Sequence, residues 1–240
     1  MPASAPLVGS PRDLLALALL VPAPTVGAWA MLHAWPGSPM GQGLSFALKL
    51  WIAVLPVLWV VRVERRFDGS WLRLRGVGRS GWLAGVGTGA AIAAVMVLAY
   101  LAAEGSIDPV PLRAKAAQTG LDRPPRLLAL FAYLVVVNSM LEEYIWRWFV
   151  VTRWERVLAG RRGAGVASVI LSALCFTVHH VVALAAWVPP GINALASVGV
   201  FAGGVIWSWL FIRTRSVWPG YVSHAAADLA ILWMAWRLMM

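Results

Sequence analysis

The sequence predicts an all-α protein, a polytopic bundle of about seven transmembrane helices. Hydrophobic residues make up 60% of the 240-residue chain and charged residues only 12%, whereas roughly a quarter of the residues in soluble domains are charged. The mean hydropathy is +0.75, and apolar segments of about 20 residues, the length of a membrane-spanning helix, recur along the whole sequence. We therefore expect residues 1–240 to form one integral-membrane domain.

Seven apolar segments are long enough to cross a bilayer. The first is expected to be retained, because Arg12 is cancelled by Asp13 and the positive region that opens a signal peptide is missing. The segments cover residues 14–35, 43–63, 81–103, 127–151, 164–187, 193–212 and 216–236.

Prolines and glycines inside the apolar segments are compatible with membrane helices. Pro22, Pro24 and Pro56 lie in the first two segments, where neighbouring groups can satisfy the carbonyls that a proline frees. Glycines recur at every fourth residue in the third and sixth segments, a spacing that favours close helix crossings. These glycines are Gly81, Gly85, Gly89, Gly199 and Gly203.

The last four segments have the same apolar character. The fourth opens with an uncharged run at Leu127, and Pro219 lies near the start of the seventh. The fifth contains the only cysteine, Cys175, among small apolar residues. A lone cysteine excludes an intrachain disulfide, and we expect Cys175 to fill the core.

The net charge of +10 arises from cations that gather in alternate connections between the apolar segments. The first and fifth connections carry no Lys or Arg. This alternation follows the positive-inside rule, so we place the N-terminus and the even-numbered connections in the cytoplasm and the C-terminus outside, and we expect no nucleic-acid partner. The cations of the second, fourth and sixth connections are Arg62, Arg65, Arg66, Arg73, Arg75 and Arg79, then Arg153, Arg156, Arg161 and Arg162, then Arg213 and Arg215.

The third connection has mixed charge and leaves one question of topology open. An eighth, interfacial helix in this connection would reverse the side on which the C-terminus lies. Its charged residues are Glu104, Asp108, Arg113, Lys115, Asp122, Arg123 and Arg126.

Almost every ionisable side chain inside otherwise apolar sequence lies in one of three short segments, 141–147, 176–180 and 224–228. An acid or imidazole in a membrane-spanning helix is costly, so it normally faces a protein interior or a water-filled cavity and indicates a functional site. The side chains concerned are Glu142, Glu143, Arg147, His179, His180, His224 and Asp228.

The spacing of these residues assigns different roles to the two glutamates. Glu143 and Arg147 are four residues apart and can form an ion pair on one helix face. Glu142 has Trp146 at the same spacing and no cation, which makes it the better candidate for a general base. The alternative is that both acids only brace the helix near the cytoplasmic surface.

The histidines lie on two other segments. His180 and Glu142 are at broadly similar depth when residues are counted inward from the fourth connection, whereas His224 is expected to be shallower. His224 and Asp228 share a helix face, so the carboxyl group could orient the imidazole or face the substrate. Neighbouring helical residues point about 100° apart, so His179 is expected to diverge from His180.

The combination of carboxylate and imidazole is suited to amide hydrolysis by an activated water. The sequence has no H-E-x-x-H motif and no G-x-S-x-G motif. A set such as Glu142, His180 and His224 could equally hold a zinc ion that polarises the water, and spacing alone does not separate these mechanisms.

Two other classes of function remain open at this stage. In a proton-coupled transporter, Glu142, Glu143, His180 and His224 would form a relay, although the two related halves that many transporters have are not evident. A non-catalytic scaffold or immunity protein would retain the bundle without the chemistry.

Three motifs occur in order along the chain: E-E-x-x-x-R from Glu142 to Arg147, F-x-x-x-H from Phe176 to His180, and H-x-x-x-D from His224 to Asp228. On these motifs the chain resembles the CPBP family of intramembrane proteases, which includes type II CAAX prenyl endopeptidases and bacteriocin-processing and abortive-infection relatives. The resemblance covers about residues 125–236, a family-like catalytic core. The first three helices carry no family signature.

The resemblance implies an intramembrane endopeptidase that cleaves a membrane-associated protein or peptide. Glu142 and His180 would activate the water, His224 and Asp228 would stabilise the oxyanion, and Glu143 with Arg147 would support the site or hold a substrate carboxylate. The family often has Asn where this chain has Asp228. Because a carboxyl group donates a hydrogen bond only when protonated, we expect Asp228 to orient His224 instead. His179 lies outside the motif and is expected to be structural.

The resemblance leaves several substrates open: a CAAX-like tail, which need not be prenylated, a C-terminal sorting tail, or a leader peptide. It implies an integral protein of a bacterial inner (cytoplasmic) membrane, with the lipid bilayer as its surroundings and no cofactor that is certain.

Overall fold

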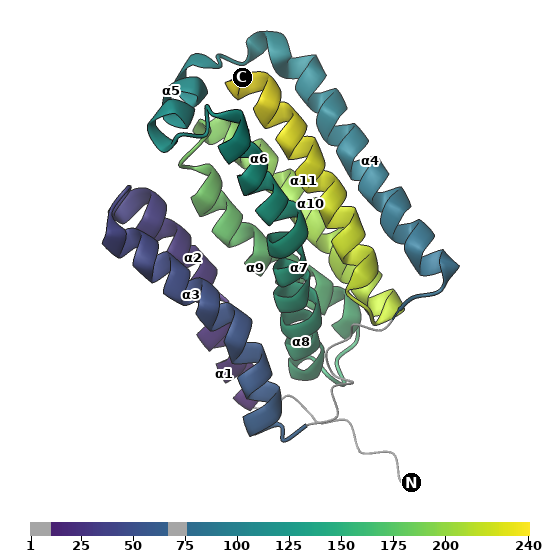
Figure 1. Ribbon diagram of the computed structural model, residues 1–240. Helices are drawn as coiled ribbons and strands as arrows, with labels where there is room; N and C mark the ends of the chain where they lie inside the picture. Colours follow the sequence, from purple (N-terminus) through teal and green to yellow (C-terminus); the bar gives the residue numbers. More distant parts are fainter. Residues whose placement is uncertain (1–10, 67–75) are drawn as a thin grey trace.

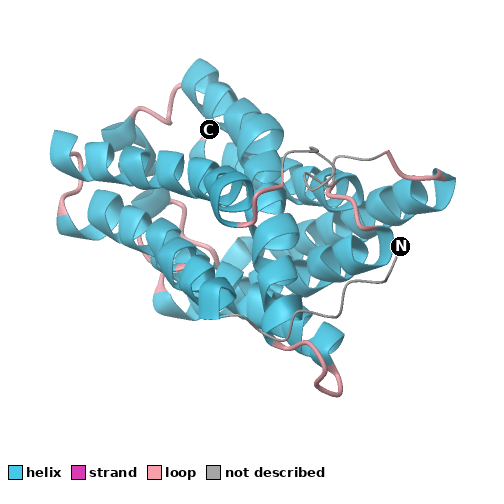
Figure 2. Cartoon of the chain, turned by 90° about the horizontal axis from the view of Figure 1, so that it is seen from below, coloured by secondary structure: helices cyan, strands magenta, loops and turns pink. Residues whose placement is uncertain are grey.

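The computed structural model describes residues 11–66 and 76–240, and the regular elements in these ranges are helices (Figure 2). The prediction of an all-α polytopic bundle is confirmed. Arg73 and Arg75, which we used for the charge pattern, lie outside the described residues. The helices are α1 (Pro11–Leu20), α2 (Pro22–Trp29), α3 (Pro39–Leu58), α4 (Arg79–Ala103), α5 (Val110–Thr119), α6 (Pro124–Tyr133), α7 (Ser139–Glu142), α8 (Thr152–Val157), α9 (Ala164–Leu184), α10 (Pro190–Thr214) and α11 (Trp218–Met239).

Several of these helices continue one another through π-helical turns. The longest example joins α6, α7 and α8 through π-helical turns at Leu134–Asn138 and Glu143–Val151. We call the resulting segment, Pro124–Val157, the site helix. In Figure 1 it runs through the middle of the bundle, with α2 and α3 on one side and α4 and α11 on the other. The remaining π-helical turns are Ala30–Ala34 and Trp59–Val63.

Within the described residues, six helical segments are long and apolar enough to cross a membrane. The seventh predicted segment forms α11, a 22-residue helix, but it does not meet the same criterion of apolarity. His224, Asp228 and Arg237 interrupt its apolar sequence, and two of them belong to the predicted site. The six segments are Pro11–Ala34, Pro39–Val63, Arg79–Ala103, Pro124–Val157, Ala164–Leu184 and Pro190–Thr214.

The third connection contains a helix, α5. Whether such a helix exists in this region of mixed charge was left open by the sequence. With 10 residues it is about 15 Å long, half the thickness of the hydrocarbon core. It therefore adds no crossing, and α1 begins at the end of the bundle opposite to the C-terminus (Figure 1). The separation of the two termini agrees with the predicted topology. Which end faces the cytoplasm stays a prediction.

Acidic and basic residues from separate segments meet at the end of the bundle where α1 begins. Arg153 is 2% exposed in its side chain and binds Asp13, with Nη1 2.8 Å from Oδ1, and also Glu64. Arg156 binds the same Glu64 carboxylate. The first, second and fourth predicted segments are thereby joined at their ends by charge-assisted hydrogen bonds, which are stronger than neutral ones.

Lowering the pH should weaken the contribution of Glu64 to stability. Burial raises the pKa of Glu64, but hydrogen bonds and charges from Arg156 and Arg153 outweigh burial and hold it below its ordinary value of 4.5. A lowered folded-state pKa stabilises the fold above the unfolded-state pKa, and this stabilisation is lost as the pH falls through the folded-state value. We expect the difference in unfolding temperature between wild type and Glu64→Gln to shrink below about pH 4. A pH-independent difference would contradict this.

Close helix crossings involve only some of the predicted glycines. A Cβ atom on Gly85 or Gly89 would lie 2.7 Å and 2.9 Å, respectively, from the backbone of Pro219 and Ser223, where α4 and α11 lie side by side (Figure 1). The prediction is confirmed for these two. Gly199 has open space around it, and Gly204 on α10 approaches Ala173 on α9 instead. The four-residue glycine repeat thus correctly indicated a close crossing of α4, but it did not identify the glycine of α10 that makes a close contact.

Gly89→Ala should destabilise the protein by about 1–3 kcal/mol, the usual cost of overpacking, because the new methyl group would press on backbone that cannot move aside. Gly87 lies two residues away in the same helix, with no atom within 4 Å of a Cβ. Gly87→Ala should therefore stabilise α4 by up to about 1 kcal/mol. Thermal unfolding in detergent compares the two. If the two substitutions changed stability equally, α4 would be able to move away from α11 without cost.

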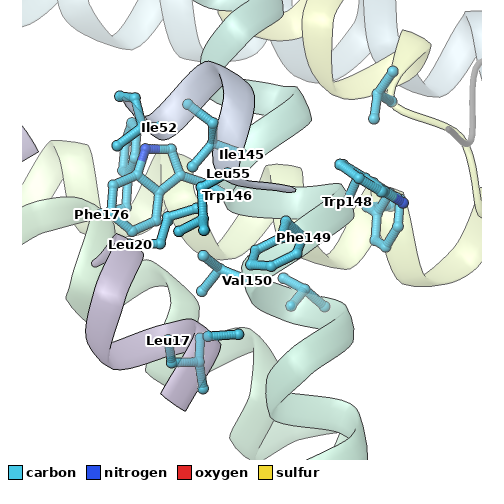
Figure 3. Packing of buried hydrophobic residues seen from close by; sticks show 14 of the residues in the cluster. Leu17, Leu20, Ile52, Leu55, Ile145, Trp146, Trp148, Phe149, Val150 and Phe176 are labelled. Atoms are coloured by element: carbon cyan, nitrogen blue, oxygen red, sulfur yellow. The ribbon is translucent and has the colours of Figure 1, made fainter. Parts of the chain in front are cut away.

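The main apolar core surrounds the lower half of the site helix. Phe149 and Val150 point into it, together with Leu17 and Leu20 from α1 (Figure 3). Ile52 and Leu55 from α3 lie near Trp146 in the same cluster (Figure 3). Half-buried Cys175 packs against this cluster, so the prediction that it fills the core is confirmed.

Candidate active site

The predicted site residues converge from the site helix, α9 and α11. Glu142 ends α7, and Glu143 begins the π-helical turn that continues to Val151. π-helical turns inside α-helices are frequent at functional sites, because the extra residue redirects the side chains that follow. Glu142 faces His179 and His224, whereas Glu143 faces Arg147 and the other ring nitrogen of His224.

The carboxylate of Glu142 has an imidazole at each oxygen. His179 Nε2 lies 3.7 Å from Oε1, and His224 Nε2 lies 3.6 Å from Oε2. Both separations exceed an ordinary hydrogen bond. As expected, Glu142 has no cation four residues along its own helix. Its neighbours are instead histidines from α9 and α11.

His180 is oriented by its own helix. Its Nδ1 lies 3.0 Å from the carbonyl oxygen of Phe176, and a carbonyl only accepts, so Nδ1 carries the proton and donates it. The neutral ring then keeps a lone pair on Nε2. His179 and His180 together with Glu142 offer ligand atoms that lie within 4.8 Å of one another.

His179 also lies in this cluster, and the structural role expected for it stays a prediction. Its ring is stacked parallel to Trp146, with ring centroids 5.3 Å apart, and its centroid is 4.1 Å from that of His180. The two Cα–Cβ directions diverge along the helix, as expected. The imidazoles are long enough to converge again on Glu142.

His224 is buried and held on both sides. Its Nδ1–H donates to Glu143 Oε1 over 3.1 Å, and its ring is stacked on Trp207 with centroids 4.0 Å apart. His224 lies level with Glu142 and not shallower, which corrects the estimate of depth. The reason is that α11 starts farther into the bundle than the point at which α8 ends (Figure 1).

Glu143 and Arg147 form the predicted ion pair, which we call the buried pair. Arg147 Nε lies 3.5 Å from Glu143 Oε1, and both side chains are fully buried. The guanidinium lies over the rings of Phe176 and Trp207, at 4.5 Å and 5.2 Å from their centroids. These rings supply cation–π contacts, and among the described residues no nitrogen of Arg147 has a hydrogen-bond acceptor. Full burial favours a supporting role for Arg147 over contact with a substrate.

Asp228 is hydrogen-bonded to the site helix and not to His224. Its Oδ2 lies 2.6 Å from the hydroxyl of Ser139, which is also 2.8 Å from the carbonyl of Leu134. The expectation that Asp228 orients His224 is therefore wrong, because Glu143 already occupies the ring nitrogen that would be oriented. Four-residue spacing placed the two side chains on one face without fixing their partners.

Sequence reasoning missed the aromatic and small residues that enclose these groups. Phe176 belongs to a motif, but its central position was not expected: its ring contacts the rings of His179, His180 and His224. Trp207 Nε1–H donates to Ser223 Oγ over 3.0 Å, which fixes the ring that supports His224. Among fifteen tryptophans it carries no distinguishing sequence signal.

Gly220→Ala should lower activity much more than it lowers stability. A Cβ atom on Gly220 would lie 2.2 Å from Glu143 Oε2, so the carboxylate that holds His224 would have to move. A displacement of about 1 Å at a reacting group can cost around a hundredfold in rate. Gly199→Ala, with open space at its Cβ, is the control. Peptide cleavage and thermal unfolding measured on both variants test this; normal activity of Gly220→Ala would contradict it.

The fold and this cluster define an integral-membrane protein with carboxylates and imidazoles gathered inside its bundle. Residues 124–230 match the family model described as "Type II CAAX prenyl endopeptidase Rce1-like". This match confirms the resemblance to the CPBP family of intramembrane proteases that was found from the motifs. No curated protein and no solved structure gives a significant match. The match supports a CAAX-type intramembrane endopeptidase in general terms.

Proposed function

We propose that the protein hydrolyses a peptide bond in a membrane-associated protein or peptide, with a water activated by Glu142. The observation that carries this proposal is the position of the Glu142 carboxylate, which has an imidazole facing each oxygen, 3.7 Å and 3.6 Å away. Water and a scissile carbonyl must meet between an acceptor for the proton and donors for the developing oxyanion. Glu142 and the surrounding histidines supply both kinds of group.

In the proposed reaction Glu142 takes a proton from water while the water oxygen attacks the carbonyl carbon. The carboxyl group then returns this proton to the leaving amine as the carbon–nitrogen bond breaks. His180 assists through the Nε2 lone pair that its bond to Phe176 leaves available. A carboxylate that changes from base to acid in this way needs no separate proton donor.

His224 is the proposed donor to the oxyanion. Because Glu143 accepts from Nδ1–H, the neutral ring presents a lone pair at Nε2 and only the doubly protonated ring donates from both nitrogens. Glu142 and Glu143 flank this ring and compensate its positive charge. Asp228, bound to Ser139, would donate to the oxyanion only when protonated.

A zinc ion is the alternative way to activate the water. Glu142, His179 and His180 have the donor chemistry that zinc prefers, and their ligand atoms lie within 4.8 Å of one another. In tetrahedral coordination with bonds of about 2.1 Å, ligand atoms are about 3.4 Å apart, so the cluster would have to contract. The ligand set expected from the sequence was Glu142, His180 and His224, so in the structure His179 takes the place of His224.

For the substrate we propose a polypeptide tail or leader held at the membrane, a CAAX-like tail among them. The site lies on helices long enough to span the bilayer, so a scissile bond must enter from the membrane or along its surface. The basic connections support a cytoplasmic N-terminus, and the resemblance supports a bacterial inner membrane.

The proposal is tested by comparing membrane proteomes of cells that carry wild type or Glu142→Gln at matched expression, with mass spectrometry of chain termini. A protein or peptide that stays uncleaved only in the variant supports the protease and identifies its substrate. Unchanged termini, with the variant folded, would refute the proposal in favour of a transporter or scaffold. Treatment of the purified enzyme with a chelator, followed by zinc, separates the zinc mechanism from the metal-free one.

A further inference from the structure

A small pocket lies at the end of the bundle where α1 begins, and the proposed reaction does not use it. Its volume is about 40 Å³, and it lies between the π-helical turn that follows α3 and the α8 end of the site helix. Thr152, one of its lining residues, follows Glu142 by ten residues, or about 15 Å along the site helix. The pocket is therefore separate from the candidate active site.

Guanidinium groups outnumber carboxylates around this pocket. Arg66, Arg153 and Arg156 line it, and Glu64 is the one carboxylate among its described lining residues. Asp13 also binds Arg153, so three guanidiniums meet two carboxylates and one positive charge stays uncompensated. Within the described ranges, no carboxylate oxygen lies within 4.0 Å of Arg66. The pocket therefore favours an anion.

Two hydrogen-bond donors that line the pocket have no acceptor in the described part of the chain. The Arg153 side chain is 2% exposed, yet its Nε–H has no partner. Threonine hydroxyls in helices commonly donate to the carbonyl four residues earlier, as Thr177 and Thr214 do, but the structure gives Thr152 no such bond. A buried donor without an acceptor is costly, so these groups indicate a ligand that accepts hydrogen bonds.

The size and the lining of the pocket fit the oxygen atoms of a phosphate group. A volume of about 40 Å³ has room for about three water-sized atoms. Guanidiniums bind phosphate through strong charge-assisted hydrogen bonds, and a hydroxyl adds a further donor. The other wall is apolar, because Val60 and Trp148 form it. A free ion has no use for this wall, whereas the glycerol carbons of a phospholipid can pack on it.

The depth of the pocket corresponds to the headgroup level of a membrane. Val60 and Thr152 lie three and five residues from Val63 and Val157, the ends of their membrane segments, or about 5 Å and 8 Å. Lipid phosphates lie at this boundary of the hydrocarbon core. Basic pockets between transmembrane helices bind anionic headgroups on the cytoplasmic side, and this is the end that the charge pattern predicts to be cytoplasmic.

We propose that this pocket binds the phosphate group of an anionic phospholipid. Arg66 and the Nε–H of Arg153 hold phosphate oxygens, the Thr152 hydroxyl donates to another, and the apolar wall contacts the glycerol carbons. The bound lipid joins the ends of the first, second and fourth membrane segments. This inference goes beyond the proposed function and does not depend on it, because the pocket shares no residue with the cluster around Glu142.

Lipid binding to the full chain tests the inference. The purified protein in nonionic detergent is titrated with phosphatidylglycerol or with phosphatidylcholine, and native mass spectrometry gives the bound fraction. Both lipids contain a phosphate, but only phosphatidylglycerol has a net negative charge. We expect phosphatidylglycerol to bind about fivefold more tightly or better, the size of the attraction between one such charge and a basic site at a membrane surface.

Substitutions in the pocket test whether this site causes the preference. Thr152→Val removes the hydroxyl with little change of shape and should weaken phosphatidylglycerol binding about tenfold, the effect of one hydrogen bond to a charged group. Arg66→Gln should weaken it at least as much. Arg162→Gln removes an exposed cation outside the pocket and should change binding by less than about twofold, because solvent screens exposed charges.

Thermal unfolding of the lipid-free protein controls for folding. The Thr152 hydroxyl has no partner within the described chain, so Thr152→Val and wild type should unfold at the same temperature without added lipid. Phosphatidylglycerol should then raise the unfolding temperature of wild type more than that of the variant. An equal rise in both proteins would contradict the proposed contact.

Other results would also overturn the inference. If phosphatidylglycerol binds no more tightly than phosphatidylcholine, or if neither pocket substitution weakens it, the pocket is not a lipid site. An equal loss in Arg162→Gln would attribute binding to the overall charge of this end of the bundle. Inorganic phosphate that displaces phosphatidylglycerol at equal concentration would assign the pocket to a soluble phosphate compound in place of the lipid.

Discussion

Replacing Glu142 by glutamine is expected to reduce peptide hydrolysis by about a thousandfold, the range in which loss of a general base falls, while the protein remains folded. The amide has the same shape but takes no proton from water. The side chain is 15% exposed, and its histidine partners lie beyond ordinary hydrogen-bond length, so little native bonding is lost. Cleavage in proteoliposomes and thermal unfolding in detergent measure the two quantities.

A matched control for Glu142→Gln is Glu155→Gln on the same site helix. Glu155 binds Arg215 through two hydrogen bonds at the basic end, 2.6 Å and 2.8 Å long, far from the cluster. This control should leave the rate of cleavage unchanged. If Glu142→Gln retains wild-type activity, the water is activated elsewhere and the proposed mechanism fails.

The parts of this structure that were predictable are those that local sequence determines. Hydropathy located the membrane segments, and four-residue spacing gave the Glu143–Arg147 pair, since both members belong to one helix. The order of three motifs gave the resemblance to the family. Each of these signals is contained in one helix or in the order of helices along the chain.

The parts that were missed depend on how separate helices meet. Which histidine faces Glu142, and which group binds Asp228, follows from the rotation and depth of α9 and α11 relative to the site helix. The π-helical turn after Glu142 changes side-chain directions in a way that ideal helical spacing does not include.

Neutralising one member of the buried pair should have the largest effect on stability. Arg147→Met would leave the Glu143 carboxylate fully buried without its cation, and breaking such a pair costs about 3–5 kcal/mol. The exposed pair of Arg215 and Glu155 is the natural comparison, because the Arg215 side chain is 45% exposed. Arg215→Met should cost no more than about 1 kcal/mol. Thermal unfolding of both variants in the same detergent gives the comparison, and equal losses would contradict it.

The double substitution Glu143→Gln with Arg147→Met separates stability from catalysis. Removing both charges should recover much of the stability lost in Arg147→Met, because no uncompensated charge stays buried. Activity should not recover. The glutamine amide can still accept from His224 Nδ1–H, but it carries no charge to compensate a doubly protonated ring. Recovery of both properties would mean that the buried pair serves the fold alone, whereas recovery of stability alone would assign Glu143 a positioning role through His224.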